Sequence, residues 1–493
     1  MIRLGPVVAT AMLPTTSGLL ESARAAFAAG ADRVEVRLDG LAPGEEIGPL
    51  LELAEERPML FSGARDAVRP EEIPVLRRAQ AAGAWVDLPF SPQTPEALFG
   101  LLPERLVLSW HDQEGTPSDL QGILLRMRQR PAAVYKLVPT ARDFPDAASV
   151  LDLLAREGSG GDLCAFAMGT PGLPTRILAL ARGSAAVYAS APGCPPGAPG
   201  QLPLTELLGI YRPAELRPGE PLYLLAGWPL RSTRSPALFN AWLGLAGLPG
   251  RYLPLPASDL APLFSRWEGS FAGMAVTIPH KEAVLAYLAS TSRLVRLLGA
   301  CNTLVHGEAG WCGANTDVFG VRRALRAVPR GSRCLLLGAG GAAAAAALAL
   351  RRIGPTAVAG RDFARTRAFA RRFGLEAMAW EERGAASWDL LVNATPLGQE
   401  GEETPLPARA LPGSWVFDMV VRPGGTPLVR QALALGLQAI PGEAMLVPQA
   451  RLQFRLWTGR RPPRRRSPPD GPQSRDGSRN GGAHPSGDKA LPP

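Results

Sequence analysis

The sequence predicts an α/β protein whose first half is a (β/α)8 barrel and whose second half ends in a Rossmann-type fold. Short apolar runs recur at regular intervals between Val7 and Ser190, and helix-like stretches lie between most of them. Further along, an apolar run leads into the glycine-rich turn Gly338–Ala343 and a long alanine-rich stretch. At 493 residues the chain is too long for one ordinary hydrophobic core, so we expect several domains.

We expect four segments along the chain. The barrel is predicted to occupy residues 1–212, and an α/β substrate-binding domain residues 220–325, with residues 440–458 returning to it. A Rossmann domain is predicted over residues 326–439. Residues 459–493 are rich in Pro, Gly, Ser and Arg and nearly free of large apolar side chains. Such a tail cannot bury enough surface to offset chain entropy, so we expect it to be disordered.

Composition and charge are those of a soluble globular protein. Hydrophobic residues make up 46% of the chain and charged residues 20%, with no apolar run of the roughly 20 residues that a membrane span needs. The N-terminus lacks a signal-peptide layout, and the five cysteines follow no metal-ligand spacing. We therefore expect a cytoplasmic protein with no metal. Much of the net charge of +9 lies in the tail, which we interpret as solvated, with no nucleic-acid partner.

Eight predicted strands make up the barrel. A (β/α)8 barrel places its active site at the carboxyl ends of its strands, so polar residues at those ends are the first candidates for a site. The predicted strands are Val7–Met12, Arg33–Leu38, Met59–Gly63, Trp85–Phe90, Leu106–Trp110, Val134–Val138, Leu163–Met168 and Ala185–Ser190.

Charged side chains lie in these strands where apolar ones are expected. Glu35, Arg37 and Asp39 alternate onto one side of the second strand, and three charges there need mutual pairing or a ligand. His111 follows the fifth strand, and Lys136 lies inside the apolar sixth strand. Burial disfavours an ammonium and lowers its pKa, which would make Lys136 a nucleophile toward a carbonyl group.

Together these features resemble type I 3-dehydroquinate dehydratase over residues 5–210. The matching motifs are Glu-x-Arg-x-Asp, Ser-Trp-His-Asp, the strand lysine, Met-Gly-x-x-Gly-x-x-Thr-Arg and a final Ala-Pro-Gly-Gln turn. The resemblance implies that Lys136 forms a Schiff base with the substrate ketone and that His111 transfers protons. It also implies that Glu35 positions His111 and the substrate, whose carboxylate and hydroxyls would be held by Arg37, Arg65, Arg176 and Gln201.

The chain departs from this family in two loops. Asp66–Arg69 follows Arg65 where the family usually has an acidic residue and then glycine, and Gly197 stands where it usually has Ser or Thr. Weaker carboxylate binding or slower dehydration would follow from these changes. A chain in which only the second half is active is therefore one alternative.

The second half carries another ordered series of polar residues. Thr233 and Ser235 precede a predicted helix, where hydroxyls and free backbone N–H groups can bind a carboxylate. A lysine, an asparagine and an aspartate ahead of a glycine-rich turn indicate a polar substrate held beside a nucleotide cofactor. The later candidates are, in chain order, Thr277, Lys281, Asn302 and Asp317.

The glycine-rich turn has the flanking elements that a dinucleotide site needs. A predicted strand precedes Gly338, a helix follows it, and a second strand, Thr356–Ala359, comes next. That strand closes with Gly360 in place of the acid that bonds a ribose 2′-hydroxyl, and Arg361 follows. This pair favours NADP over NAD, although the adjacent Asp362 favours NAD.

Across residues 220–458 the order and spacing of the motifs closely resemble shikimate dehydrogenase. The resemblance implies that Lys281 and Asp317 assist proton transfer at the C3 oxygen of the substrate. It assigns substrate binding to Thr233, Ser235, Thr277, Asn302 and Gln449. It assigns cofactor binding to Gly338, Ala339, Gly340, Gly341, Ala342, Arg361, Asn393 and Thr395.

The two halves resemble consecutive shikimate-pathway enzymes, in the arrangement of bifunctional plant proteins. We therefore expect the barrel to dehydrate 3-dehydroquinate to 3-dehydroshikimate, and the second half to reduce this to shikimate with NADPH, on the route to chorismate and the aromatic amino acids. Alternatives are a quinate/shikimate dehydrogenase working with NAD and, more remotely, a non-catalytic metabolite sensor. Val421, where the dehydrogenase family usually has tyrosine, leaves the substrate specificity open.

Overall fold

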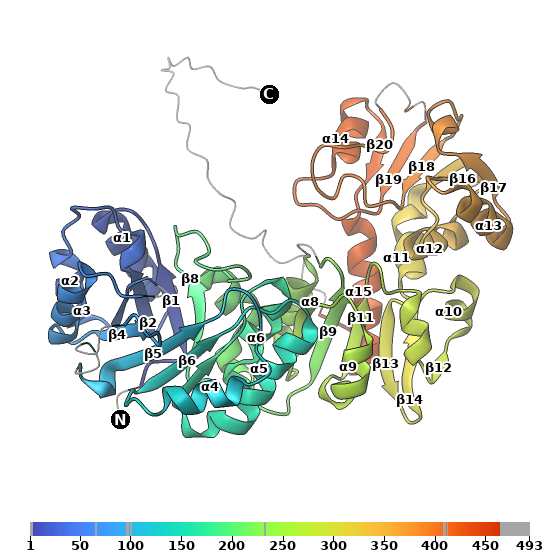
Figure 1. The fold of residues 1–493 in the computed structure, drawn as a ribbon. Coiled ribbons are helices and arrows are strands. Elements are labelled where there is room, and N and C mark those ends of the chain that lie inside the picture. Colours follow the sequence, from blue (N-terminus) through green and yellow to red (C-terminus); the bar gives the residue numbers. More distant parts are fainter. Residues whose placement is uncertain are drawn as a thin grey trace, which may run out of the picture.

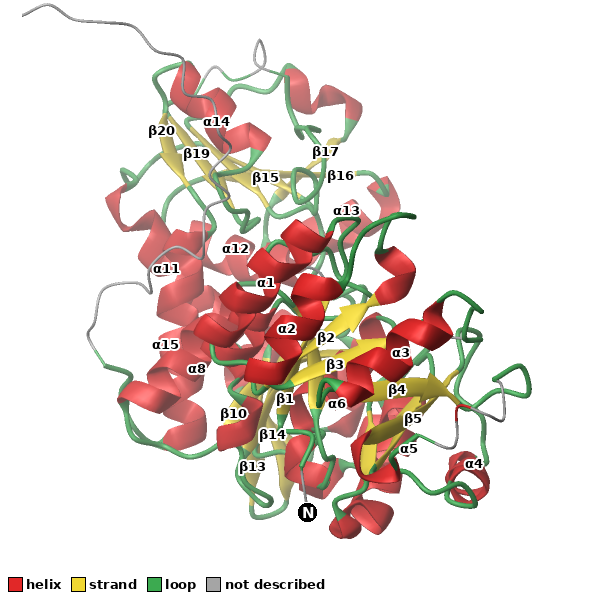
Figure 2. Ribbon diagram, turned by 90° about the vertical axis from the view of Figure 1, so that its left-hand side faces the viewer, coloured by secondary structure: helices red, strands yellow, loops and turns green. Residues whose placement is uncertain are grey.

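The computed structural model describes residues 3–463, apart from 65–66, 95–97, 99–100, 231–232, 408–410 and 412, so most of the predicted tail lies outside the described residues. Within these residues the chain forms three β-sheets surrounded by helices, so the predicted α/β class is confirmed. Figure 1 shows the N-terminal sheet on the left, the second sheet beside it and the third above the second. Figure 2 shows the helices packed around the strands of each unit. No helix in the described part is long and apolar enough to cross a membrane.

Eight parallel strands build the first sheet of the described chain, in the order β7-β6-β5-β4-β3-β2-β1-β8. β7 and β8 stand at the two ends of this order, and there the Ala185 N–H donates to the Leu163 carbonyl at 2.7 Å. The barrel is thus nearly closed, and the predicted (β/α)8 architecture is confirmed. The strands are β1 (Val7–Ala11), β2 (Arg33–Arg37), β3 (Met59–Ser62), β4 (Trp85–Pro89), β5 (Leu106–His111), β6 (Val134–Val138), β7 (Leu163–Ala165) and β8 (Val187–Ser190).

Short polar side chains cap the starts of three barrel helices, α1, α4 and α5. The Thr15 hydroxyl accepts a hydrogen bond from the Gly18 N–H at the start of α1, and the Asp143 carboxylate accepts one from the Asp146 N–H at the start of α5. The apolar faces of these helices pack on the outside of the barrel strands. The helices of this unit are α1 (Thr16–Ala28), α2 (Gly48–Glu56), α3 (Glu72–Ala81), α4 (Leu120–Met127), α5 (Phe144–Glu157), α6 (Leu173–Leu178) and α7 (Leu204–Glu206).

The second sheet is mixed, with the order β10-β9-β11-β13-β14-β12 among the described residues. β9 pairs in parallel with β10 and β11, whereas β13 runs antiparallel to β11 and β14. The strands are β9 (Leu222–Gly227), β10 (Arg251–Pro256), β11 (Gly273–Val276), β12 (Ser290–Thr291), β13 (Thr303–Gly307) and β14 (Gly310–Ala314). The helices are α8 (Ser235–Leu245), α9 (Ala261–Arg266), α10 (Arg293–Leu298) and α11 (Asp317–Ala324).

The third sheet is parallel, and its described strands have the order β17-β16-β15-β18-β19-β20. The chain runs outward in both directions from β15, so the strand order reverses between β15 and β18, where open α/β sheets bind their ligands. The strands are β15 (Cys334–Leu337), β16 (Thr356–Gly360), β17 (Glu376–Ala379), β18 (Leu390–Asn393), β19 (Trp415–Asp418) and β20 (Gln438–Ile440). The helices are α12 (Gly341–Leu350), α13 (Phe363–Phe373) and α14 (Pro427–Ala434).

The last helix, α15 (Glu443–Thr458), leaves the third sheet and returns to the second one. Figure 1 shows it in red, running from the upper unit down to the lower. Gln453 on this helix donates from Nε2 to the Asn302 carbonyl at 3.1 Å and to the Thr303 hydroxyl at 2.9 Å. These bonds connect α15 to the segment around Asn302, which lies about 150 residues earlier in the sequence.

The barrel and the second unit share a packed apolar boundary. Phe144 of α5 meets Trp267 edge-on, with 5.6 Å between ring centroids, and the Arg182 guanidinium lies 5.1 Å from the same indole. Arg266 and Asp152 form an ion pair at 2.5 Å across the boundary. Apolar side chains of both units belong to one hydrophobic cluster, so the two units pack against each other over an apolar surface.

Trp267→Ala is expected to destabilise both units together. The indole is only 7% exposed, and its loss should lower the free energy of unfolding by about 3–5 kcal/mol. Thermal unfolding followed by circular dichroism should show the main transition of the variant at a lower temperature and still as one step. Trp388→Ala, a matched change of a buried tryptophan in the third unit, should leave the unfolding temperature of the barrel unchanged. Early melting of only part of the Trp267→Ala chain would contradict a shared boundary.

Candidate functional site

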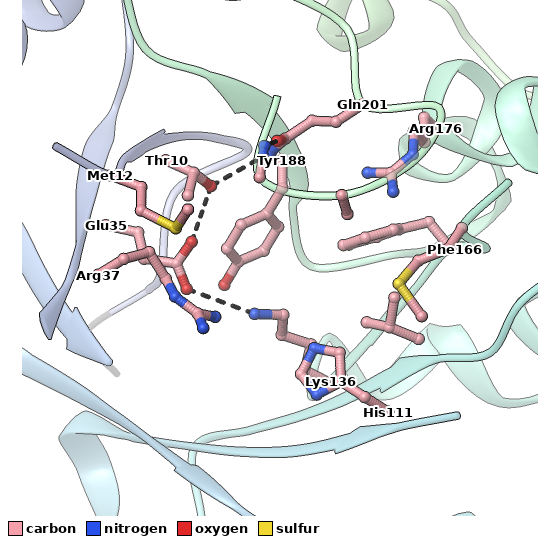
Figure 3. Close-up of a pocket in the computed structure, with 14 residues that line it drawn as sticks. Thr10, Met12, Glu35, Arg37, His111, Lys136, Phe166, Arg176, Tyr188 and Gln201 are labelled. Carbon is pink, nitrogen blue, oxygen red and sulfur yellow. Dashed lines mark hydrogen bonds and ion pairs between the residues drawn. The ribbon is translucent and has the colours of Figure 1, made fainter. Parts of the chain in front are cut away.

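A pocket opens at the carboxyl ends of the barrel strands (Figure 3). It encloses about 430 Å³ of atom-free space, part of it open to solvent. Arg65 was also predicted for this site, but it lies outside the described residues. The predicted residues that the structure brings together around the pocket are Glu35, Arg37, His111, Lys136, Arg176 and Gln201. Lining residues that the sequence analysis did not single out include Thr10, Met12, Val138, Phe166, Met168 and Tyr188.

Lys136 lies at the floor of the pocket between two carboxylates. Its side chain comes from β6 and is buried, with the residue only 4% exposed. The ammonium Nζ donates to Asp87 Oδ2 at 2.9 Å and lies 3.5 Å from Glu35 Oε1. It also lies 4.2 Å from the centroid of the Tyr188 ring, a cation–π contact. The ammonium is therefore fully desolvated but well compensated.

The sequence-based expectation that burial lowers the pKa of Lys136 is wrong for this structure. Burial is the largest single influence and does lower the pKa, because it removes water from the ammonium. The charges of Asp87 and Glu35 together outweigh it, so the pKa of Lys136 lies above its ordinary value. At neutral pH the resting lysine is consequently an ammonium, which has no lone pair for attack.

Four polar side chains form one layer inside the barrel. They come from alternate strands: Glu35 from β2, Asp87 from β4, Lys136 from β6 and Tyr188 from β8. The interior of such a barrel is packed in layers of four side chains from alternate strands, and bulky aliphatic residues usually fill them. Here the apolar layers continue below, with residues such as Val134. The chain thus replaces one apolar layer by an ionic one at the floor of the pocket.

Asp87 is the member of this layer that the sequence analysis missed. It lies in the apolar strand Trp85–Pro89, so the signal that identified Lys136, a charge inside a buried strand, was present here too. The two carboxylates of the layer differ in proton affinity. Burial raises the pKa of Asp87, and the negative Glu35 adds to this against the opposing effect of Lys136. Burial also acts on Glu35, but Lys136 and then Arg37 outweigh it and hold the pKa of that carboxyl below its ordinary value.

Two arginines provide positive charge in the pocket. Arg176 on α6 is 2% exposed, and its guanidinium stacks 4.7 Å from the centroid of the Phe166 ring. Arg37 pairs with Asp39 at 2.6 Å, and both of its donor nitrogens in that pair face the same carboxylate. A desolvated guanidinium forms strong, planar hydrogen bonds with a carboxylate, so this region suits an anionic ligand.

Gln201 connects the loop after β8 to the ionic layer. Its Oε1 accepts a hydrogen bond from the Gly197 N–H at 2.6 Å, and its Nε2 donates to the Thr10 hydroxyl at 3.3 Å. The Thr10 hydroxyl in turn donates to Glu35 Oε2 at 2.7 Å. Figure 3 shows this chain of contacts running down from Gln201 to Lys136. A ligand that reaches Gln201 is thus linked to the floor of the pocket.

A second polar network lies in the second unit. Lys281 Nζ donates to Asp317 Oδ2 at 2.5 Å, and Asn302 Nδ2 donates to the other oxygen of the same carboxylate at 2.8 Å. Thr316 joins the network, because its hydroxyl donates to Gln449 Oε1 at 3.0 Å and accepts from Asn302 Nδ2 at 3.0 Å. Four predicted residues are therefore in one cluster. Thr316 is the residue that the sequence analysis missed, although it directly precedes Asp317.

The remaining predicted substrate residues lie on neighbouring elements. Ser235 begins α8, and its backbone N–H donates to the Thr233 hydroxyl at 3.2 Å, so these two residues form a local turn. Thr277 directly follows β11 and bonds back to the Ala226 carbonyl through its N–H at 2.9 Å. The His280 N–H then donates to the Thr277 carbonyl at 2.9 Å. This bond closes a turn that positions the backbone of the next residue, Lys281.

The glycine-rich turn lies against the lysine of this second network. Gly338, after β15, has φ +109°, and a Cβ added there would come within 3.0 Å of the Ala394 carbonyl oxygen. α12 begins at Gly341, where an added Cβ would lie 3.3 Å from the Cβ of Lys281. Only glycine fits such positions without displacing its neighbours. The turn and the free N–H groups of the helix start therefore form a cradle suited to a pyrophosphate.

Three further residues were predicted to contact the cofactor. Arg361 is exposed directly after β16, at the carboxyl edge of the sheet. Thr395 lies beside Gly338, and its hydroxyl donates to Asn393 Oδ1 at 2.6 Å. Asn393 is 0% exposed, and its amide also donates to Asp418 at 2.9 Å. The Asn393 side chain thus bonds to other residues of the protein and positions the loop that carries Thr395.

Sequence models of known families match three stretches of the chain. Residues 7–216 match type I 3-dehydroquinase, residues 225–304 the substrate binding domain of shikimate dehydrogenase, and residues 442–466 the C-terminal domain of shikimate 5′-dehydrogenase. A relative that spans both halves is the chloroplastic bifunctional 3-dehydroquinate dehydratase/shikimate dehydrogenase of Arabidopsis thaliana. It is 30% identical over 472 residues, which cover 87% of this chain and 78% of the relative. The chain belongs to this bifunctional family.

Further similar proteins match the dehydrogenase half of this bifunctional chain. The shikimate dehydrogenase (NADP+) of Acidiphilium cryptum is 44% identical over 245 residues, covering 47% of this chain and 88% of the relative. Among solved structures, shikimate 5-dehydrogenase of Thermus thermophilus in complex with NADP(H) and shikimate is 37% identical, with a TM-score of 0.45 and coverage of 49% and 95%. Quinate dehydrogenase of Corynebacterium glutamicum in complex with NAD is 31% identical, with the same TM-score and coverage.

Thr316→Val is expected to weaken the second site of the bifunctional chain. The change keeps the shape of the side chain but leaves Gln449 Oε1 without its donor and Asn302 with one acceptor fewer. Loss of a buried hydrogen bond of this kind should lower kcat/KM for 3-dehydroshikimate by about tenfold. Dehydration of 3-dehydroquinate by the same protein sample is the control and should be unchanged. Equal kcat/KM values in variant and parent would show that Thr316 does not position the site.

Proposed function

We propose that the chain catalyses two consecutive reactions. The barrel dehydrates 3-dehydroquinate to 3-dehydroshikimate, and the second half reduces this product to shikimate with NADPH. The observation that carries the proposal is the presence of two lysine-centred sites in one chain of the bifunctional family. Lys136 shares its pocket with His111, and Lys281 lies between Asp317 and the glycine-rich turn.

In the barrel, Lys136 is the proposed nucleophile and His111 the proposed proton carrier. The free amine attacks the ketone carbon, the ketone oxygen leaves as water, and an iminium remains. The iminium withdraws electrons, so His111 can remove the neighbouring α-proton. The resulting enamine expels the β-hydroxyl, which takes a proton from His111 and leaves as water. Hydrolysis of the iminium then releases the product and regenerates Lys136.

The substrate of this half is an anion, and the positive groups of the pocket are proposed to hold its carboxylate. The guanidinium of Arg176 is buried against Phe166, so a bond from it to a carboxylate is shielded from water and strong. Gln201, through its amide, would bind a substrate hydroxyl or carboxylate oxygen and is linked to Glu35 by Thr10. The proposed binding set is Glu35, Arg37, Arg65, Arg176 and Gln201.

In the second half, Lys281 and Asp317 are the proposed catalytic pair. Bound nicotinamide supplies the hydride for reduction. Lys281 Nζ would stabilise the negative charge that develops on the C3 oxygen and donate a proton to it. Asp317 accepts a hydrogen bond from the same Nζ and fixes its position, while Asn302 holds the other carboxylate oxygen. The proposed substrate contacts are Thr233, Ser235, Thr277, Asn302 and Gln449.

NADP is the proposed cofactor, and the residues present fit it. The turn from Gly338 to Ala342 can receive the pyrophosphate, and Arg361 lies where a ribose 2′-phosphate would be bound. Asp362, which favoured NAD when the sequence alone was considered, is used differently. Its carboxylate accepts a hydrogen bond from the Arg365 N–H at 2.9 Å and caps α13. A carboxylate committed to a helix start is a poor partner for a ribose hydroxyl.

We also propose the domain bounds expected from the sequence. The first sheet ends at Ser190, the strands of the second lie between Leu222 and Ala314, and those of the third between Cys334 and Ile440. The proposed domains are residues 1–212, residues 220–325 with 440–458, and residues 326–439.

A cytoplasmic location is the proposal for the whole protein. All five cysteines are free thiols in the structure, and thiols persist in a reducing compartment.

Purified protein given 3-dehydroquinate alone should consume NADPH, because each half supplies one step. Absorbance of NADPH would be followed with 3-dehydroquinate and, separately, with 3-dehydroshikimate. Lys136→Ala should abolish consumption with the first substrate and keep it with the second, since the dehydrogenase site is untouched. Consumption by the parent protein with 3-dehydroshikimate only would overturn the dehydratase assignment.

Arg361→Ala should shift cofactor preference from NADPH toward NADH. Loss of a charge-assisted contact to the 2′-phosphate is expected to raise KM for NADPH by about 10- to 100-fold and to leave KM for NADH nearly unchanged. Arg371→Ala, which removes an exposed arginine from the helix that follows, is the matched control. If both variants use NADPH equally well, Arg361 does not bind the 2′-phosphate.

A further inference from the structure

The dehydration proposed for the barrel leaves the activation of Lys136 unexplained. Attack on a ketone needs the neutral amine, but the surroundings of Lys136 favour the ammonium. The residue is 4% exposed, so direct loss of its proton to bulk water is slow. An acceptor inside the barrel that lies within hydrogen-bond reach of Nζ would speed this step.

The groups that face Lys136 come from five strands. On β2 lie Glu35 and Arg37, on β4 Asp87, on β5 His111, on β7 Cys164 and on β8 Tyr188. Burial raises the pKa of the Cys164 thiol to about 11 and that of Tyr188 well above its ordinary value, so both remain protonated. Arg37 is a cation, and His111 is the proposed proton carrier for the substrate itself. Two carboxylates are left as acceptors.

Geometry separates these two carboxylates. Asp87 Oδ2 accepts a hydrogen bond from Nζ at 2.9 Å, whereas Glu35 Oε1 lies 3.5 Å from the same atom. Glu35 also lines the pocket and already accepts a bond from the Thr10 hydroxyl at 2.7 Å. Asp87 does not line the pocket and is buried behind the lysine, at 4% exposure. Glu35 is thus placed to meet the substrate, and Asp87 is placed to serve the lysine.

We propose that Asp87 takes a proton from the Lys136 ammonium, frees the amine that attacks the substrate ketone, and afterwards acts as the counter-ion of the iminium. This inference rests on the dehydratase function proposed above. It makes Asp87 a catalytic residue, because its carboxylate touches the reacting nitrogen.

The step balances without any further reactant. The Nζ–H bond to Asp87 breaks, an Oδ2–H bond forms, and the electron pair left on Nζ makes the new bond to the ketone carbon. Of the three hydrogens on the ammonium, one stays on the iminium nitrogen and two leave with the ketone oxygen as water. Asp87 holds one of these two hydrogens until the ketone oxygen leaves, and then gives it up as a proton to the departing water. Asp87 therefore ends the step as a carboxylate. The iminium then has a negative partner.

The transfer also leaves the total charge of the ionic layer unchanged. Lys136, Asp87 and Glu35 begin as one cation and two anions, and after the transfer the layer still carries one negative charge. No charge has to enter or leave this buried layer, and moving a charge into or out of a desolvated region is the costly event. A fixed base beneath the lysine therefore prepares the nucleophile before any substrate bond has formed.

Asp87→Asn in the full chain tests the proposal, with 3-dehydroquinate as the probe. The amide keeps the size of the side chain and can still accept a hydrogen bond from Nζ, but it cannot take the proton. Single-turnover dehydration at pH 7 should be about 100-fold slower than in the parent. Between pH 6 and 9 the variant rate should rise with pH, because without the Asp87 carboxylate the free amine arises mainly by proton loss through the pocket to solvent. The parent rate should be nearly flat over this range.

Two controls separate catalysis from folding. Reduction of 3-dehydroshikimate by the same samples reports whether the chain is intact and should be unchanged. Cys164→Ser, a conservative change beside the same lysine, should keep both the rate and the flat pH profile. If Asp87→Asn does not fold, Asp87→Ser, which is smaller, should give the same rising profile.

The outcomes distinguish this proposal from the function on which it rests. A parent protein that never dehydrates 3-dehydroquinate would refute the dehydratase function itself. A working parent together with an equally fast Asp87→Asn variant would overturn only the role of Asp87. A variant that is slower but has the same flat pH profile would also overturn it, because a purely structural defect lowers the rate without changing its dependence on pH.

Discussion

A charge with little access to water needs an opposite charge within reach, and the lysines of both candidate sites satisfy that constraint. In the barrel, the ammonium of Lys136 lies between Asp87 and Glu35, and the three groups replace part of the apolar packing that normally fills such an interior. In the second unit, Lys281 is paired with Asp317, which Asn302 holds from the other side. Removing one partner from the barrel group would leave a buried charge without full compensation, so the surrounding strands must keep these residues in register.

The two lysines face different chemical demands, and their surroundings differ accordingly. In the proposed dehydration Lys136 becomes a neutral amine, and it has two carboxylates around it, so a proton can move within the layer without a change in total charge. In the proposed reduction Lys281 is a cation until it donates its proton, and it has one carboxylate, which itself accepts a further bond from an amide. The second arrangement favours a fixed ammonium, because both oxygens of Asp317 are already engaged. The lysine that must lose a proton before its proposed reaction thus has two neighbouring carboxylates, and the lysine that begins its reaction as an ammonium has one.

Much of the fold could be predicted because parallel strands buried on both faces produce apolar runs, in which Lys136 and Glu35 stood out at once. Asp87 was also recognisable as a charge in an apolar run, but its place beside Lys136 depends on the register of the strands. It pairs with Val107, which pairs with Val134, and only the two-residue step from there to Lys136 shows that the two side chains share a layer. The sequence-based expectation of a lowered pKa for Lys136 was wrong for the same reason. Burial can be inferred from an apolar run, whereas the counter-charges come from strands far away in the sequence.

The return of α15 to the second unit has a consequence for how this protein is made. Residues up to Tyr211 complete the barrel and its pocket, so the dehydratase half can fold while the ribosome is still translating the rest. The dehydrogenase half has no such freedom. The proposed substrate network includes Gln449, and Gln453 anchors the loop of Asn302, so this network is incomplete until the final helix has emerged from the exit tunnel. During each round of synthesis the first activity therefore matures well before the second, and a premature stop codon within α15 would leave a chain with a complete barrel and an unfinished reductase.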